Sequence, residues 1–400
     1  MAETATSHLT GLVLPGGGAR AAYQVGVLRA IADLLPARAA IPFPVVTGVS
    51  AGALNATELA IHAGRFRIAT GNLERVWRNF QVNQVFRSST LNMIQGGFRW
   101  LTAMLSAGWL MSPPKSLLDN EPLRQLLTDN FDCNCIRRSI EQGHLRALAI
   151  AAASYKDARA VTFFEAGSDC REWQAGRRSG VATKITLDHL MASTAVPFLF
   201  PPVMLNGEHF GDGSMRQATP FSAAIHLGAD RLLVIGARND AIRETRRGGV
   251  SPSFGQIFGY MLDALFSDGL YSDLDRLRQI NEVLRQTGPL RVNDVELKPV
   301  ELLAILPSRD LSAIAREHVN GLPRTLRALL RSMNAMDHGG GELMSYLMFQ
   351  GSYTRELIAL GYQDAMQRSE EIKTFLRCGD SSATSGIRRL RIASENLRAG

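Results

Sequence analysis

A serine held between two glycines is the first feature of this 400-residue chain that could do chemistry. The segment Gly48-Val49-Ser50-Ala51-Gly52 matches the Gly-x-Ser-x-Gly pattern, which places a serine on a tight turn from a strand to a helix. The flanking residues must be small because the backbone of such a turn is strained and crowded. The following helix would offer free N–H groups to developing negative charge. Ser50 is therefore a candidate nucleophile, although an ordinary tight turn would produce the same pattern.

Three consecutive glycines, Gly16-Gly17-Gly18, follow the first apolar run and could supply hydrogen-bond donors. Without side chains they let the backbone approach a ligand and turn several N–H groups toward one point. Acyl-transfer enzymes use such donors to stabilise an oxyanion, and each contributes roughly 3 kcal/mol. The segment from Gly16 to Ala21 also fits the relaxed dinucleotide pattern Gly-x-Gly-x-x-Ala, so a nucleotide-binding oxidoreductase is an alternative. The acidic residue of that pattern is poorly matched, because Asp33 falls within an expected helix.

An aspartate between glycines, Gly211-Asp212-Gly213, could supply the base. Such a turn can point a carboxylate into a site, although it is also a common surface turn. Histidines in the same part of the chain offer an alternative base, as in a conventional α/β-hydrolase with a Ser-acid-His triad. The histidines are His189, His209 and His226.

The chain around these residues alternates between strand-like apolar runs and helix-like periodic segments. Strand, helix, strand and helix follow one another within the first 60 residues, which predicts a parallel sheet covered by helices. From about residue 240 helical periodicity dominates, as at Leu270, Leu274 and Leu277. The expected strands are residues 9–14, 45–47, 145–152, 161–165, 231–236 and 300–306, and the expected later helices are 270–284, 311–332 and 340–376.

Four segments, in this order, resemble motifs of the patatin-like phospholipase family. They are similar to its glycine-rich oxyanion loop, its nucleophile elbow, its Ala-Ser-x-x-x-Pro segment and its catalytic Asp-Gly pair. The segments are Gly16-Gly17-Gly18-Ala19-Arg20, Gly48-Val49-Ser50-Ala51-Gly52, Ala192-Ser193-Thr194-Ala195-Val196-Pro197 and Asp212-Gly213. Two positions depart from the family pattern, because Ala21 and Ser214 stand where glycine is usual. The resemblance covers about residues 9–215.

The resemblance implies an α/β fold: a three-layer α/β/α domain with a mainly parallel central sheet, followed by a mostly helical C-terminal region. We expect the catalytic domain at residues 8–240, the helical region at 241–376 and a flexible tail at 377–400. The tail is rich in Ser, Arg and Gly and has little apolar content.

The resemblance also implies a serine acyl hydrolase that releases fatty acids from phospholipids or other lipid esters. Ser50 and Asp212 would form a catalytic dyad without histidine. The oxyanion hole would be formed by Gly16, Gly17, Gly18, Arg20 and Ala51. We expect no cofactor and no metal, because the sequence contains no ligand cluster. A non-catalytic lipid-binding protein with the same fold is the remaining alternative.

The composition bears on partners and location. Lys and Arg number 44 against 37 Asp and Glu, a net charge of +7 that permits attraction to anionic membranes. Residues 91–111 contain Trp100 and Trp109 and suit either a membrane-contacting lid or a core helix. We find no signal peptide and no apolar run long enough to span a membrane. We therefore expect a cytoplasmic or peripheral membrane protein without a nucleic-acid partner, and signal-independent secretion is equally compatible; no oligomeric state is predicted.

Overall fold

The computed structural model describes residues 8–87, 116, 118–216, 220–239, 242, 253–288, 290–292, 295–332, 335–336 and 341–376. Residues 91–111 and the tail at 377–400 lie outside these ranges, so the expectations for them stay predictions.

Ten strands of the described chain form one mixed sheet in the order β12-β9-β1-β2-β3-β4-β6-β5, with β8 also paired to β3 and β7 to β8. From β12 to β3 all neighbours run parallel, whereas β4 and β8 are antiparallel to β3. The strands are β1 (Thr10–Leu14), β2 (Val45–Val49), β3 (Ala147–Ser154), β4 (Ala160–Ala166), β5 (Trp173–Ala175), β6 (Arg178–Ala182), β7 (Val203–Leu205), β8 (Glu208–Asp212), β9 (Arg231–Ile235) and β12 (Glu301–Ile305), with a separate hairpin of β10 (Leu290–Val292) and β11 (Val295–Leu297).

All six expected strands are present as β1, β2, β3, β4, β9 and β12. Strands β5 to β8 and the hairpin were not expected from the sequence. Strands β5, β7, β10 and β11 have only three residues each, which is too short for a clear alternating pattern. Strands β6 and β8 have five residues but contain no apolar run.

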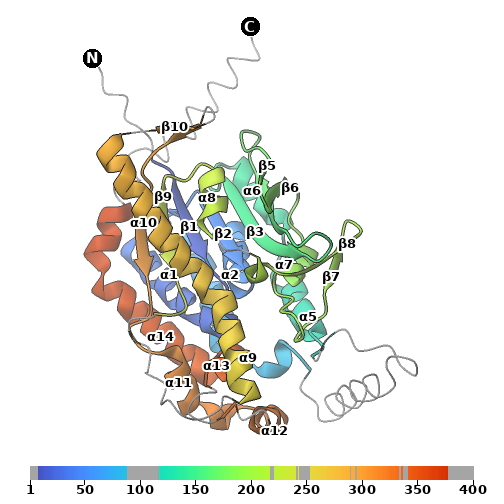
Figure 1. The fold of residues 1–400 in the computed structure, drawn as a ribbon. Helices are drawn as coiled ribbons and strands as arrows, with labels where there is room; N and C mark the ends of the chain where they lie inside the picture. The colour runs from blue at the N-terminus through green and yellow to red at the C-terminus, as the bar shows by residue number, and fades with distance from the viewer. Residues whose placement is uncertain are drawn as a thin grey trace, which may run out of the picture.

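Helices cover both faces of the sheet, because successive side chains of a buried strand point to opposite sides. In β1, Leu12 and Leu14 pack into the larger core, while Val13 packs into a second core beneath α8 and α10. Figure 1 shows α10 crossing one face of the sheet, with α1 on the other side. This arrangement confirms the predicted three-layer α/β/α class. The helices of the layers are α1 (Ala22–Leu34), α2 (Ala51–Ile61), α3 (Phe66–Arg78) and α14 (Gly351–Gln367) on one face and α8 (Phe221–His226) and α10 (Gly269–Thr287) on the other.

The region after residue 240 is mainly helical, as expected, but it is integrated with the rest of the fold. Its strand β12 extends the central sheet beside β9, and α14 packs closely along α1. A side chain at Gly26 would come within 2.0 Å of the Ile358 carbonyl oxygen, and the Tyr23 hydroxyl donates a 2.9 Å hydrogen bond to Asp364. The C-terminal region therefore contributes to the same core as the N-terminal strands.

The remaining elements are shorter helices and turns that surround this framework. They are η1 (Gly18–Ala21), η2 (Val82–Gln84), α5 (Glu121–Asn130), α6 (Asn134–Glu141), α7 (Leu187–Ser193), η3 (Gly213–Met215), α9 (Phe254–Asp263), the π-helical turn η5 (Ala264–Asp268), α11 (Leu311–Glu317), η6 (Val319–Gly321), α12 (Arg324–Ser332) and α13 (Gly341–Leu347).

Candidate active site

Ser50 stands at the junction of β2 and α2, in a strained backbone conformation with φ 53° and ψ −129°. Few residues other than glycine adopt such a conformation, which costs roughly 1–3 kcal/mol. The turn leaves no room for side chains at its glycines. A Cβ atom at Gly52 would lie 2.1 Å from the Leu14 carbonyl oxygen, and one at Gly48 would lie 2.5 Å from the Gly52 carbonyl oxygen. The Gly-x-Ser-x-Gly pattern is thus required by close packing of β1, β2 and α2.

Asp212 ends β8, which the antiparallel pairing with β3 brings next to the end of β2. Its side chain is fully buried. One carboxylate oxygen, Oδ1, accepts a 2.9 Å hydrogen bond from the Ser214 N–H, while Oδ2 has no hydrogen-bond partner. A buried acceptor without a partner is costly and calls for an explanation.

Burial raises the pKa of Asp212 to about 6, because a charged carboxylate is poorly solvated there. The Ser50 hydroxyl and then the Ser214 N–H and hydroxyl lower this pKa in part. The Ser50 hydroxyl therefore lies close to the carboxylate. A carboxyl group that titrates near neutral pH suits a general base.

The end of α7 and the residues that follow it hold both candidate residues in place. The Ser193 hydroxyl accepts a 2.9 Å hydrogen bond from the Ser50 N–H and donates one of 2.7 Å to the Ala151 carbonyl oxygen of β3. Two residues later, the Ala195 carbonyl oxygen accepts a 2.8 Å hydrogen bond from the Asp212 N–H. The Ala-Ser-x-x-x-Pro segment thus links the nucleophile turn, the central strand and the aspartate.

The glycine loop lies directly beside Ser50. Gly18 and Ala51 line the same cavity as Ser50, and each is the first residue of its helix. The N–H groups at a helix start have no partner within the helix and can serve as anion donors. Gly16 and Gly17 directly precede Gly18 in the chain but are not among the residues that line this cavity. A Cβ atom at Gly16 would come within 2.7 Å of the Ser214 hydroxyl oxygen.

A chain of buried amides joins the glycine loop to α2 and α3. The Gln24 side chain donates a 2.8 Å hydrogen bond to the Pro15 carbonyl oxygen and accepts one of 2.9 Å from Asn55. Asn55 in turn accepts a 2.9 Å hydrogen bond from the Trp77 indole N–H. Satisfied buried networks of this kind rigidify their surroundings, so the loop and the nucleophile helix are held in one geometry.

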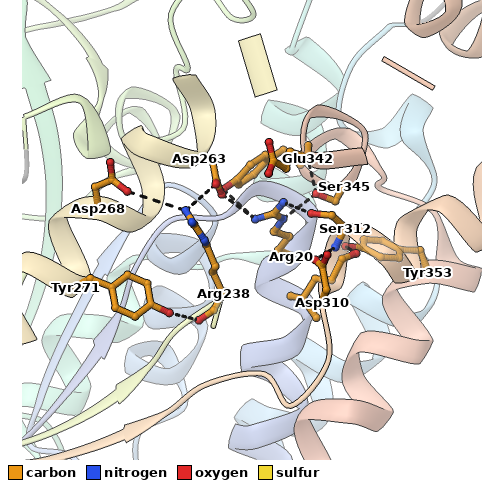
Figure 2. Close-up of polar contacts among 12 residues, drawn as sticks. Arg20, Arg238, Asp263, Asp268, Tyr271, Asp310, Ser312, Glu342, Ser345 and Tyr353 are labelled. Atoms are coloured by element: carbon orange, nitrogen blue, oxygen red, sulfur yellow. Dashed lines mark hydrogen bonds and ion pairs between the residues drawn. The ribbon is translucent and has the colours of Figure 1, made fainter. Parts of the chain in front are cut away.

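Arg20 follows the three glycines, and its side chain lies in a buried cluster with residues of the C-terminal region (Figure 2). Its guanidinium donates 2.7 Å hydrogen bonds to the Ser345 and Ser312 hydroxyls and pairs with Asp263 at 3.3 Å. It also stacks over the Tyr346 ring, with 4.0 Å to the centroid. Arg20 is therefore placed to anchor the loop, and it is absent from the residues that line the Ser50 cavity.

None of the three candidate histidines contacts the Ser50 or Asp212 side chain. His189 is hydrogen-bonded through Nδ1 to Thr186 at the start of α7, and burial lowers its pKa. His226 stacks on Trp173 at 4.9 Å. His209 belongs to β8 but is three residues from Asp212, so its side chain points to the opposite face of the strand. The geometry favours the dyad over a triad.

The cavity beside Ser50 has a volume of about 580 Å³, including its open mouth. Its wall is almost wholly apolar, and much of it comes from the region after residue 260, which the sequence patterns did not connect with the site. The lining residues from that region are Leu262, Phe266, Tyr346, Leu347 and Phe349. A helical apolar pattern indicates burial but not against which cavity, so no local signal identified them.

Within the ranges that the structure describes, no three His, Cys, Asp or Glu side chains are placed to hold a metal ion. No helix among the same residues is long and apolar enough to cross a membrane.

Comparison with known proteins identifies the family of this chain. The model of the patatin-like phospholipase family matches residues 12–225, which is more than half of the chain, and the chain belongs to this family. No curated protein matches it. Among solved structures, it is similar to human GIVD cytosolic phospholipase A2 in complex with methyl gamma-linolenyl fluorophosphonate, with 14% sequence identity and a TM-score of 0.43. The match covers 96% of this chain and 60% of that chain, so this chain spans less than two thirds of that phospholipase. Family membership supports lipid hydrolase activity.

Proposed function

We propose that this protein is a serine acyl hydrolase that releases fatty acids from phospholipids or other lipid esters through a Ser50–Asp212 dyad. One observation carries the proposal: the fully buried Asp212 carboxylate lies close enough to the Ser50 hydroxyl for that hydroxyl to lower its pKa, while its Oδ2 has no hydrogen-bond partner. The apolar lining of the adjacent cavity favours a fatty acyl chain over a polar acyl group.

In the first step, the Ser50 oxygen attacks the ester carbonyl carbon while its proton passes to Asp212. The carbonyl oxygen becomes an oxyanion, and the N–H groups of Gly18 and Ala51, with Gly17 beside them, stabilise it. The tetrahedral intermediate then collapses, and the alcohol leaves with the proton from Asp212. The acyl group remains bound to Ser50.

In the second step, Asp212 takes a proton from a water molecule, which attacks the acyl-serine carbonyl. Collapse of this second intermediate releases the fatty acid and returns the proton to Ser50. The helix start at Ala51 stabilises both intermediates, because each carries its negative charge on the same carbonyl oxygen. Arg20 contributes by holding the glycine loop rather than by touching substrate.

The decisive experiment measures fatty-acid release from phospholipids and glycerides by the wild type and by Ser50→Ala. We expect Ser50→Ala to abolish activity while leaving folding almost unchanged, since removal of a nucleophile costs many orders of magnitude. A fluorophosphonate probe should label the wild type and not the variant. Retention of more than about one tenth of the activity would exclude Ser50 as the nucleophile.

A non-catalytic lipid-binding protein is the second candidate, because the apolar cavity alone would serve it. It predicts vesicle or lipid binding without probe labelling of Ser50. The dyad itself is tested separately: Asp212→Asn should be about as inactive as Ser50→Ala, whereas His189→Ala, His209→Ala and His226→Ala should stay active. A histidine variant as inactive as Ser50→Ala would replace the dyad with a triad.

A further inference from the structure

Helix α9 (Phe254–Asp263) is apolar on its outer face as well as on its inner face. Its first nine residues carry no charge. The outer face exposes large apolar side chains, which are Phe254 at 65%, Ile257 at 47%, Tyr260 at 54% and Met261 at 52%. A surface helix ordinarily turns polar residues to solvent, and a helix that is hydrophobic all round is ordinarily buried in a core or in lipid. We therefore expect the outer face of α9 to be covered by another apolar surface or by lipid.

The inner face of α9 is already occupied, so the exposed stripe is not an unpacked core. Gly255, Gly259 and Leu262 are buried on that side. A Cβ atom at Gly259 would lie 2.9 Å from the Leu343 nitrogen of α13. The exposed Phe254 ring stacks parallel to the ring of Phe258, which is partly buried against the core, with 6.2 Å between the ring centroids. The helix is thus fixed on the protein with a preformed apolar ridge facing outward.

The same helix belongs to the wall of the Ser50 cavity. Leu262 and Phe266, one turn further on, line that cavity. Figure 1 shows α9 extending beyond the lower end of α10 and past the sheet. An exposed aromatic ring on another segment flanks the cavity: Phe198, 58% exposed and held at φ 65°, directly precedes the lining residues Leu199 and Phe200. Exposed apolar groups thus adjoin the lipid cavity on two separate elements.

We propose that α9 is a membrane-docking helix whose outer face, made of Phe254, Ile257, Tyr260 and Met261, inserts into the interfacial region of a phospholipid bilayer. This inference rests on the proposed lipid-ester substrate. Such a substrate must leave a bilayer to reach Ser50, and α9 joins the water-exposed surface to the cavity wall. Aromatic and aliphatic side chains on one helix face suit this interface, with the tyrosine hydroxyl near the headgroups.

Because the outer face of α9 carries no charge, the effect of salt on vesicle binding can be predicted. Insertion of apolar side chains is not screened by ions, whereas attraction of basic residues to anionic lipid is. Docking through α9 should therefore occur on phosphatidylcholine vesicles and weaken little at high salt. Added anionic lipid should strengthen it through the net positive charge of the chain.

The test compares Ile257→Ser/Tyr260→Ser with the matched control Ile280→Ser/Val283→Ser. Both pairs are exposed large apolar residues three positions apart, and the control pair lies on α10 at 43% and 51% exposure. We expect the α9 variant to lose vesicle sedimentation and vesicle-lipid turnover by about tenfold or more. It should hydrolyse the soluble ester p-nitrophenyl butyrate at the wild-type rate. The control variant should behave as the wild type in all three assays.

Three other outcomes would overturn the proposal. Unchanged vesicle binding by the α9 variant would show that another surface meets the membrane. Unchanged vesicle binding with a smaller size on gel filtration would assign α9 to contact between two copies of this chain. A parallel change in soluble-ester and vesicle turnover would indicate that another segment of this chain covers α9. If the wild type binds vesicles but hydrolyses neither substrate, the proposed function is wrong. The membrane-docking role of α9 is then still tested by comparing vesicle sedimentation of the wild type and the α9 variant.

Discussion

The N–H of Ser50 and the hydroxyl of Ser193, 143 positions apart in the chain, form a 2.9 Å hydrogen bond at the base of the candidate site. The same hydroxyl donates a hydrogen bond to the carbonyl oxygen of Ala151 in the central strand β3. The nucleophile turn is therefore attached to the sheet through a side chain, in addition to its own strand and helix. Ser193 does not touch a substrate position and acts through Ser50, which makes it a positioning residue.

Replacing Ser193 with Ala should lower kcat/KM by about 10- to 100-fold, because displacement of a reacting group by about 1 Å has this effect. KM should change little, since the apolar cavity is retained. Ser139→Ala is the matched control: it removes another buried hydroxyl that donates to a backbone carbonyl, that of Ile61. Each variant should lose about 1 kcal/mol of unfolding free energy. Equal losses of activity in the two variants would contradict a specific role of Ser193 in positioning Ser50.

The activity should depend on pH through Asp212. As a base, Asp212 must be ionised, and burial raises its pKa to about 6. We expect kcat/KM to fall as the pH decreases through about 6, with one proton taken up. A histidine base would also titrate in this range, so the comparison with His189→Ala, His209→Ala and His226→Ala is needed. A profile that stays flat down to the ordinary carboxyl range, near the reference pKa of 3.8, would contradict a buried aspartate base.

The same carboxylate should weaken the fold at neutral pH. The folded protein retains a proton on Asp212 between the ordinary pKa of 3.8 and about 6, where the unfolded chain has lost it. Stability from this group is therefore complete below the ordinary pKa and is lost as the pH rises through about 6. Asp212→Asn should raise the free energy of unfolding at neutral pH, by up to about 3 kcal/mol, and change it little in acid. Denaturant titrations of both proteins at the two pH values measure the difference. If Asp212→Asn were destabilised equally at neutral and at acid pH, the Asp212 carboxylate would be stabilising, which contradicts the prediction.

Removing Arg20 should destabilise the protein through the cluster in Figure 2. Arg20→Ala leaves Ser312, Ser345 and Asp263 with fewer partners in a buried setting. We expect a loss of about 3–5 kcal/mol, as for other broken buried ion pairs. Arg78→Ala, which removes an exposed pair with Glu74, should cost less than about 1 kcal/mol. Chemical denaturation of the two variants measures their free energies of unfolding and so tests whether Arg20 anchors the loop. A loss at Arg20 as small as that at Arg78 would contradict the anchoring role.

The local features of the site could be predicted from the sequence because each depends on close steric contacts along the chain. A serine on a strand-to-helix turn requires glycines around it, and the structure shows backbone atoms where their side chains would be. The apolar runs of β1, β2, β3 and β9 likewise predicted a parallel sheet, since buried strands read as continuous apolar segments. Ser50 and the glycine loop were named on such grounds, whereas the role of Asp212 as the base was implied by the family resemblance.

Only the tertiary structure decided what surrounds those residues. The burial that raises the pKa of Asp212 depends on the pairing of β8 with β3, and β8 was not visible in the sequence. The partners of Arg20 lie more than 240 positions away in the chain, and residues after 260 complete the cavity wall. Contacts at such separations leave no periodic pattern in a single sequence, because periodicity reports only that a face is buried. For the same reason, no pattern in the sequence indicated that α9 exposes the large apolar side chains of Phe254, Ile257, Tyr260 and Met261.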